Sequence, residues 1–364
     1  MVYIPRSDLE KLCADIFIAL GIPREEAFDS AGILVAADAR GIRSHGVARI
    51  KRYADGIRAN LIKGNIKPTV VRETPVSLVL DAEGAMGLSL SKKSMERVIA
   101  MAKEHGVGFC AIRNSNHFGI AGYYAEMAAR QDMIGIAMTN TAALGVPTFA
   151  REAMFGTNPI AFAAPGLEGN MFSLDMATTA VTRGKIEVMA REGKTLPPGW
   201  AVGTKGLSAA DPVKLLDDML FQRGGGLLPL GGEGESLSGY KGYGLAVMVD
   251  ILTAVCSGGV FGGSVKDSGI TSARVCHFFM ALRIDLFRDP TEFKQDISRM
   301  LDELTALKPA EGADRVYYAG LKEQEAEARS EKEGVPLTDG VWKTLKETAE
   351  SLGLKPIDVP VPHL

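Results

Sequence analysis

The first sixty residues of the chain show the spacing of α-helices. The apolar residues of the first segment recur every three or four positions, as they do on the buried face of a helix: Leu9, Leu12, Ile16 and Leu20. Ser7 followed by Glu10 is a capping-box pattern that predicts the start of this helix, and Gly-Ile-Pro at 21–23 predicts its end. Two further helices are expected, one over about 25–37 and one that begins near Ser44 as its N-cap.

From about residue 74, short apolar runs alternate with amphipathic segments. The apolar runs are expected to form strands: 76–80, 107–112, 134–138, 160–164, 172–174 and 277–284. Helices are expected over 88–104 and 123–130. Because strands alternate with helices, this part of the chain is typical of an α/β domain.

A glycine- and proline-rich composition sets residues 191–238 apart, and we expect long loops there. Asp289-Pro290 marks a boundary. After it the pattern is helical again: 292–307, 323–333 and 341–352. We expect the helical ends to pack together as one discontinuous domain, 1–72 with 290–364, around an α/β domain of residues 73–289.

Residues 242–263 are long and apolar enough to suggest a membrane span. The segment nevertheless contains Asp250 and six glycines. A helix buried inside a globular core therefore explains the segment better than a membrane helix.

The composition narrows the class of protein. The 364-residue chain has a formal net charge of -3, so it lacks the basic excess that nucleic-acid binding needs. The cysteines lie outside zinc-motif spacing and are expected to be reduced, buried thiols: Cys13, Cys110, Cys256 and Cys276. The first residues include acids and no apolar signal core, which predicts a cytoplasmic protein without membrane association.

Several well-known motifs are missing. The sequence has no phosphate-binding P-loop. Its nearest match to the dinucleotide fingerprint, residues 106–111, follows a predicted helix and leads into a strand, the reverse of the order in a Rossmann site. There is no H-E-x-x-H, and the five histidines are far apart, so no metal site is expected.

The first dense polar cluster occupies residues 40–49. If Ser44 caps the third helix, His45 and Arg49 stand four positions apart on one face. Arg49 could then hold a carboxylate in a two-pronged clamp while Ser44 and His45 offer hydrogen bonds. A capped, solvated helix end explains the same pattern, and spacing alone leaves both interpretations open.

The second cluster, residues 113–122, directly follows the strand expected at 107–112. Ligand groups in α/β domains gather at the carboxyl ends of strands, and a histidine there can move a proton near neutral pH. His117 is therefore a candidate general base for oxidation of an alcohol. The alternative is a histidine whose hydrogen bonds are satisfied by the polar loop around it.

Three further polar segments adjoin apolar strands or the buried helix: 156–159, 175–185 and 239–244. Each is compatible with turn chemistry alone. Lys185 and Lys241 could equally offer charge to phosphates or carboxylates.

Taken together, these segments resemble the malate/L-lactate dehydrogenase family of NAD(P)-dependent enzymes that lack a Rossmann fold. The resembling segments occur in order along nearly the whole chain: RGIRSHGVARIKRY, RNSNHFGIAGYYA, GTNPIAFAAP, LDMATT with RGKIE, LLPLGG and GYKGYGLAVMVDIL. The resemblance implies an α/β fold with a non-Rossmann mixed sheet flanked by helices, plus a helical domain built from both chain ends. It also implies a homodimer.

The resemblance further implies which residues form the site. His117 and the pair Ser44–His45 match the family's proton-transfer residues, and members differ in which histidine is assigned that role. Matches to substrate-binding positions are Arg49, Thr157, Arg183 and Gly184. Matches to cofactor-binding positions are His117, Phe118, Gly119, Ile120, Ala121, Asn140, Asp175, Met176, Ala177, Pro229, Leu230 and Gly320. No metal is implied.

The implied reaction passes a hydride between NAD or NADP and a small anionic 2-hydroxy/2-oxo acid, malate/oxaloacetate first among the candidates. Lactate, sulfolactate, ureidoglycolate, a diketo-sugar acid or a cyclic imine are alternatives within the family. A non-catalytic NAD(P)-binding sensor is the alternative from another class. Two departures from the family pattern, the loop 211–238 and the turn at Gly320, leave cofactor contacts open there.

Overall fold

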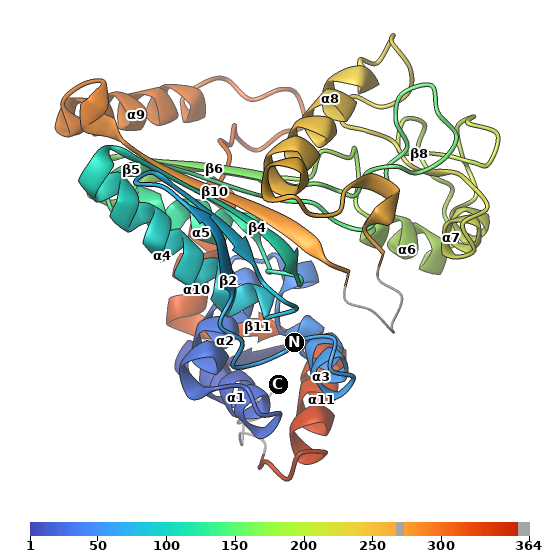
Figure 1. Ribbon diagram of the computed structural model, residues 1–364. Helices are drawn as coiled ribbons and strands as arrows, with labels where there is room; N and C mark the ends of the chain where they lie inside the picture. The colour runs from blue at the N-terminus through green and yellow to red at the C-terminus, as the bar shows by residue number, and fades with distance from the viewer. Residues whose placement is uncertain (267–272, 356–364) are drawn as a thin grey trace.

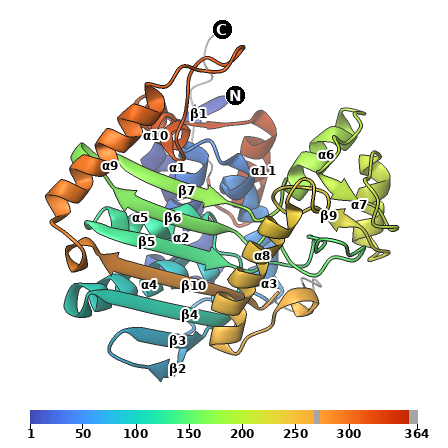
Figure 2. The ribbon, with the colours of Figure 1, turned by 90° about the horizontal axis from the view of Figure 1, so that it is seen from above.

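The computed structural model describes residues 1–266 and 273–355. Its centre is a seven-stranded sheet with the order β2-β3-β4-β10-β5-β6-β7 (Figures 1 and 2). The strands are β2 (Thr69–Glu73), β3 (Ser77–Asp81), β4 (Val107–Ser115), β5 (Met133–Thr139), β6 (Ile160–Pro165), β7 (Met171–Met176) and β10 (Val275–Arg283). Only β3 and β4 run parallel, and all other neighbours are antiparallel. The expected mixed, non-Rossmann sheet is confirmed.

Two helices cover one face of this sheet, α4 (Gly87–His105) and α5 (Ala121–Ala129) (Figure 1). Strand residues alternate between the two faces, and those directed at α4 and α5 are fully buried, among them Cys110, Phe279 and Ala137. This layer forms the largest hydrophobic core of the protein. The loop that follows β4 and precedes α5 is therefore anchored on both sides.

Helices from the two chain ends pack beneath this layer (Figure 1). They are α1 (Arg6–Ala19), α2 (Arg24–Ala39), α3 (Ile50–Arg58), α10 (Leu321–Glu333) and α11 (Asp339–Glu350). Strands β1 (Val2–Ile4) and β11 (Val335–Leu337) pair and tie the ends together. In contrast, α9 (Pro290–Thr305) contacts β6 and β7 of the main sheet. The exact division at 72/73 and 289/290 stays a prediction.

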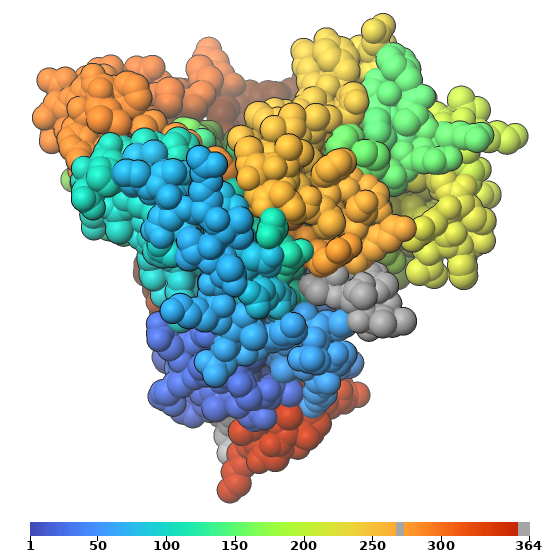
Figure 3. All heavy atoms as spheres, viewed as in Figure 1, coloured from blue at the N-terminus to red at the C-terminus, as the bar shows by residue number. Residues whose placement is uncertain are grey.

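A smaller lobe projects beside the sheet (Figures 1 and 3). It contains α6 (Arg183–Arg191), β8 (Ala201–Val202), α7 (Pro212–Leu220), β9 (Gly226–Leu227) and α8 (Gly239–Asp250). The expectation of loops throughout 191–238 is thus wrong, because α7 lies there. Asp211 caps this helix, its side chain accepting hydrogen bonds from two backbone N–H groups, and Pro212 occupies the first turn.

Two predicted helix starts also need correction. The first helix begins at Arg6 after Pro5, and Ser7 lies inside it rather than at its cap. The third α-helix begins at Ile50 instead of near Ser44. Short 3₁₀ turns occupy 43–45 and 47–49, because extended Gly46 interrupts the helical path between them.

The segment 242–263 is not the buried helix that its apolar character predicts. The α8 helix ends in a π-turn over 251–255, and Ile251, Val255 and Phe261 are about half exposed, at 48%, 56% and 51%. Cys256 is also exposed, in contrast to the other three thiols, and all four cysteines are free. Within residues 1–266 and 273–355, no helix is long and apolar enough to cross a membrane.

Candidate active site

The turn that follows α2 presents Ser44 and His45. The Ser44 Oγ lies 2.8 Å from His45 Nδ1, within hydrogen-bonding distance. The Arg49 Nε donates a hydrogen bond of 2.7 Å back to the Ser44 carbonyl oxygen. The proposed helical spacing of His45 and Arg49 is therefore wrong, but the turn still brings the two side chains to one place.

The loop after β4 presents His117. The Asn116 side chain donates hydrogen bonds to the carbonyl oxygens of Gly84 (2.8 Å) and Ala85 (3.0 Å), which fixes this loop against the start of α4. Gly87 allows the close approach, since a Cβ there would lie 2.1 Å from the Asn116 carbonyl oxygen. His117 is therefore held by a loop that is fixed at the end of the sheet.

The two histidines meet in the folded chain. Their rings stack with centroids 5.5 Å apart and planes inclined by 21°. The Tyr53 hydroxyl, from α3, lies 2.6 Å from His117 Nδ1. Where Nδ1–H donates to the Tyr53 hydroxyl, which in turn can donate to the His117 carbonyl oxygen at 3.3 Å, Nε2 is the nitrogen that can accept a proton.

Burial keeps both imidazoles neutral. It lowers the pKa of His45 to about 4, with the nearby Arg49 adding to the effect. It lowers the pKa of His117 well below its ordinary value, and His45, Arg52 and Arg49 lower it further. A neutral imidazole is the form that can accept a proton.

Cations gather beside this pair. Arg49 lies close enough to Arg52 and to Glu187 of α6 for both to influence its pKa, which burial lowers. Glu187 is paired with Arg183 at 3.0 Å, so the lobe brings a second predicted substrate residue toward Arg49. Gly184 is next to Arg183 at the exposed start of α6.

Thr157 lies just before β6, between Thr141 and Thr178. Its backbone N–H donates a 3.0 Å hydrogen bond to the Thr141 hydroxyl, and its carbonyl accepts from Thr178. Within the described residues, no direct bond links Thr157 to the histidine pair.

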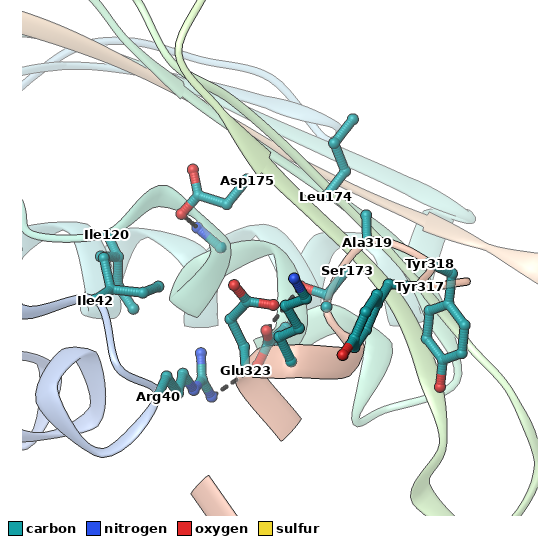
Figure 4. A pocket seen from close by; sticks show the side chains of 14 residues that line it. Arg40, Ile42, Ile120, Ser173, Leu174, Asp175, Tyr317, Tyr318, Ala319 and Glu323 are labelled. Carbon is teal, nitrogen blue, oxygen red and sulfur yellow. Dashed lines mark hydrogen bonds and ion pairs between the residues drawn. The ribbon is translucent and has the colours of Figure 1, made fainter. Parts of the chain in front are cut away.

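A cavity of about 350 Å³ lies between the N-terminal end of α5, the end of β7 and the turn before α10 (Figure 4). Three predicted cofactor residues line it, Ile120, Asp175 and Gly320. Asp175 is exposed to the cavity, and its carboxylate accepts a 2.7 Å hydrogen bond from the Gly122 N–H. Protein atoms crowded around the cavity raise the Asp175 pKa to about 6 and Glu126 adds to the rise, although part of the side chain is open to the cavity.

The other predicted cofactor residues do not line this cavity. Phe118, Gly119 and Ala121 are buried in the loop and in α5. The Asn140 side chain is engaged on both sides, accepting from the Cys276 N–H at 2.7 Å and donating to the Val260 carbonyl at 3.0 Å. Met176 and Ala177 are half-buried at the end of β7, and Pro229 and Leu230 lie in the lobe.

An ion-pair network forms the floor of the cavity. Arg40, only 6% exposed, pairs with Glu126 of α5 at 2.7 Å and with Glu327 of α10 at 3.0 Å. Arg6 contacts Glu327 at 3.1 Å. Sequence reasoning missed this network, because its members come from four elements far apart in the chain: α1, the end of α2, α5 and α10.

Sequence reasoning also missed His277. This fully buried side chain lies between the hydroxyls of Ser115 (2.8 Å) and Thr139 (2.9 Å) and stacks on Phe118 with centroids 4.6 Å apart. It therefore joins the ends of β4 and β5 behind His117. A lone histidine inside the apolar run 275–282 was the available signal. Within the described ranges, no cluster of side chains suits a metal ion.

Comparisons with known proteins agree with this geometry. The family model "Malate/L-lactate dehydrogenase" matches residues 4–346. Malate dehydrogenase of Pyrococcus abyssi is 42% identical over 98% of this chain and 97% of its own length. L-sulfolactate dehydrogenase of Methanocaldococcus jannaschii is 37% identical, with 97% and 98% covered.

Among solved structures, malate dehydrogenase from Entamoeba histolytica superposes with a TM-score of 0.91 at 33% identity, covering 99% of both chains. Family match, identity and fold agree over almost the entire length. This chain belongs to the malate/L-lactate dehydrogenase family.

Proposed function

We propose that this protein is a malate dehydrogenase, which passes a hydride between a nicotinamide dinucleotide and the C2 atom of malate or oxaloacetate. Membership of the family makes it a pyridine-nucleotide-dependent dehydrogenase of 2-hydroxy acids. The observation that carries the proposal is the neutral, stacked pair His45–His117 beside Arg49. This arrangement places a proton acceptor next to a carboxylate-binding cation.

The histidine pair supplies the proton chemistry. In the oxidation direction, a neutral imidazole of the pair would take the hydroxyl proton, and a bound nicotinamide would supply the acceptor for the hydride from C2. Burial lowers both histidine pKa values, and a bound anionic acid would raise them again because negative charge favours imidazolium. In the reduction direction, substrate binding thus helps to load the proton that the 2-oxo acid needs.

The cations favour a substrate with two acidic groups. Arg49 would hold the C1 carboxylate, because a guanidinium fixes both the position and the angle of a carboxylate. Arg52 and the ion pair of Arg183 with Glu187 lie near Arg49, and we expect this region to receive a second anionic group. Malate and sulfolactate have such a group and lactate does not, which places lactate behind both.

The cavity beside Asp175 fits part of a nicotinamide dinucleotide. Asp175 can accept hydrogen bonds from ribose hydroxyls, and Lys322 in the lining can offer positive charge to a phosphate, whereas Arg40 is already paired with two carboxylates. At Gly320 the chain packs directly against Ser173 at the edge of the cavity. A Cβ at this position would lie 2.9 Å from Ser173, so only glycine allows the contact. Either NAD or NADP is compatible with this lining, so both belong in the test.

The experiment is a panel of initial rates followed at the absorbance band of the reduced nicotinamide. Oxaloacetate, sulfopyruvate and pyruvate are each offered with NADH and with NADPH. We expect the highest kcat/KM with oxaloacetate. Higher values with sulfopyruvate would replace malate by sulfolactate, and cofactor binding without turnover of any acid would favour a sensor.

A homodimer is part of this proposal. The sheet face opposite α4 and α5 is lined by apolar side chains that are only half-buried and that cross neighbouring strands in register: Phe109, Met280, Ile136, Phe162 and Leu174. Figure 2 shows this face, with α8 and α9 at its sides. A second copy would cover it together with the exposed Ile251 and Val255. A monomer by sedimentation at micromolar concentration, with full activity, would refute the dimer.

A cytoplasmic location remains a prediction.

A further inference from the structure

Asp38 lies beneath the turn that presents Ser44 and His45. It occupies the last turn of α2 and is 2% exposed. Its Oδ2 accepts a 2.7 Å hydrogen bond from the Val47 N–H, two residues beyond His45. The carboxylate thus ties the rigid end of α2 to the turn that follows it.

The same carboxylate explains why residue 46 is glycine. Gly46 has φ of -89°, which any residue can adopt, so backbone freedom is not the reason. A Cβ at this position would instead lie 2.1–2.3 Å from the carboxyl atoms of Asp38. The Gly46 Cα therefore packs directly onto the carboxylate, and no side chain fits between them.

We propose that Asp38 is a positioning residue for the reaction: its carboxylate, packed against Gly46 and bonded to Val47, holds the turn that places Ser44 and His45 beside His117. This inference rests on the proposed function, in which the histidine pair moves the proton. Asp38 touches neither histidine through a hydrogen bond in the described structure, so it acts through the backbone of the turn.

The ionisation of Asp38 gives the proposal a measurable signature. Burial raises the Asp38 pKa to about 7, although the Val47 N–H and the nearby Arg43 lower it. From α1, the buried Cys13 faces the carboxylate, and its own pKa is raised well above the ordinary value, so it stays a neutral thiol. An ionised carboxylate accepts the stronger hydrogen bond, and the turn is held best above pH 7.

Activity and stability should therefore respond to pH in opposite directions. As pH rises from 6 to 8, ionisation of Asp38 tightens the turn, and kcat/KM rises. The Asp38 pKa is raised above its unfolded value of 3.8. Its contribution to stability is therefore lost as pH rises from about 4 to about 7. A residue with a purely structural role would not make kcat/KM rise over the pH range in which stability falls.

The test compares Asp38→Asn with the wild-type protein from pH 5 to 9. The amide can still accept the Val47 hydrogen bond but cannot ionise. We expect kcat/KM at pH 8 to fall at least about tenfold, the rise near pH 7 to disappear and cofactor affinity to stay within about twofold. The melting temperature of Asp38→Asn relative to wild type should increase between pH 5 and 7. A wild-type pH profile in a folded Asp38→Asn would overturn the proposal.

Asp29→Asn is the matched control. Asp29 lies on the same helix, and its carboxylate pairs with Lys92 at 2.7 Å, away from the turn. Its kcat/KM and pH profile should equal those of the wild-type protein.

A double-substitution cycle tests the packing without relying on Asp38→Asn. Gly46→Ala should lower kcat/KM at least about tenfold in the wild-type background but less than about twofold in Asp38→Ala, where the colliding carboxylate is gone. Equal losses in both backgrounds would contradict the proposed contact.

A last readout separates failure of this proposal from failure of the proposed function. The rate at which diethylpyrocarbonate modifies His45, followed by peptide mass, needs no turnover. It should depend on pH near 7 in the wild-type protein and lose that dependence in Asp38→Asn. The same dependence in both would reject the positioning role even if no acid in the panel were turned over.

Discussion

The two walls of the candidate site are built differently. The wall of His45, His117 and Tyr53 stands on the largest core of the protein, with its loops fixed by buried hydrogen bonds. The opposite wall, the lobe of α6 to α8, has only a small core, around Ile186, Leu215 and Leu227. Its ion pairs are mostly exposed.

We infer that the rigid wall carries out proton transfer and that the loop-rich lobe selects the substrate. Proton transfer needs groups held to within fractions of an ångström, and a rigid wall supplies them. Substrate choice needs side chains that can vary without loss of the fold, and a loop-rich lobe supplies those. Substitutions in the first wall should therefore cost far more than substitutions in the second.

Arg40→Ala should have the largest effect. The substitution leaves the carboxylates of Glu126 and Glu327 without their shared buried cation. Loss of one partner of a buried ion pair costs about 3–5 kcal/mol. Chemical denaturation measures this, and a loss below about 1 kcal/mol would show that the floor of the cavity is not rigidly held.

The second prediction concerns His277 and acid. Burial lowers the His277 pKa to about 3. The group is neutral in the folded chain but protonated in the unfolded chain below pH 6.5, so its stabilising contribution falls as pH drops from 6.5 toward 3, by up to about 1.4 kcal/mol per pH unit. His277→Gln removes this term. The unfolding free energy of wild type minus that of His277→Gln should shrink as pH falls from 7 to 5, and a constant difference would contradict the shifted pKa.

Arg49→Lys should have an intermediate effect on activity. Lysine keeps the charge but loses the two-pronged geometry, so KM should rise and kcat/KM should fall about tenfold, while cofactor affinity barely changes. Steady-state kinetics and a cofactor titration measure both. Unchanged kinetics would move the carboxylate site toward Arg183 on the lobe.

Lys194→Ala should have the smallest effect. Lys194 pairs with Glu192 on the surface of the lobe, where both side chains are largely exposed and water screens the charges. The unfolding midpoint and kcat/KM should not change measurably. A clear loss of stability would show that the lobe is more tightly built than its core suggests.

Sequence patterns predicted much of the fold because they report burial. The strand at 107–115 and the helix at 87–105 show strong periodicity, and both lie within three residues of their expected ends. The prediction of a helix beginning near Ser44 was wrong because the path of residues 43–49 depends on the packing of Gly46 against Asp38. Periodicity does not encode that contact. The prediction of a buried helix over 242–263 was wrong because an apolar pattern alone does not distinguish a partly exposed surface from a core.

The site shows the same limit. Cluster composition and family resemblance singled out His45, His117 and Arg49, and the structure brings them together. The ion-pair partners of Arg40 and the position of His277 come from distant elements and lack a local pattern. The roles of all these residues in turnover stay predictions until they are measured.

Turnover of His117→Ala tests the central claim most directly. At saturating cofactor and oxaloacetate we predict a loss of at least about 10²-fold in kcat, the scale of general acid–base catalysis, with cofactor affinity retained. His105→Ala, at the exposed end of α4, is the matched control and should be fully active. Near-normal turnover by a folded His117→Ala would contradict the account and remove His117 from proton transfer.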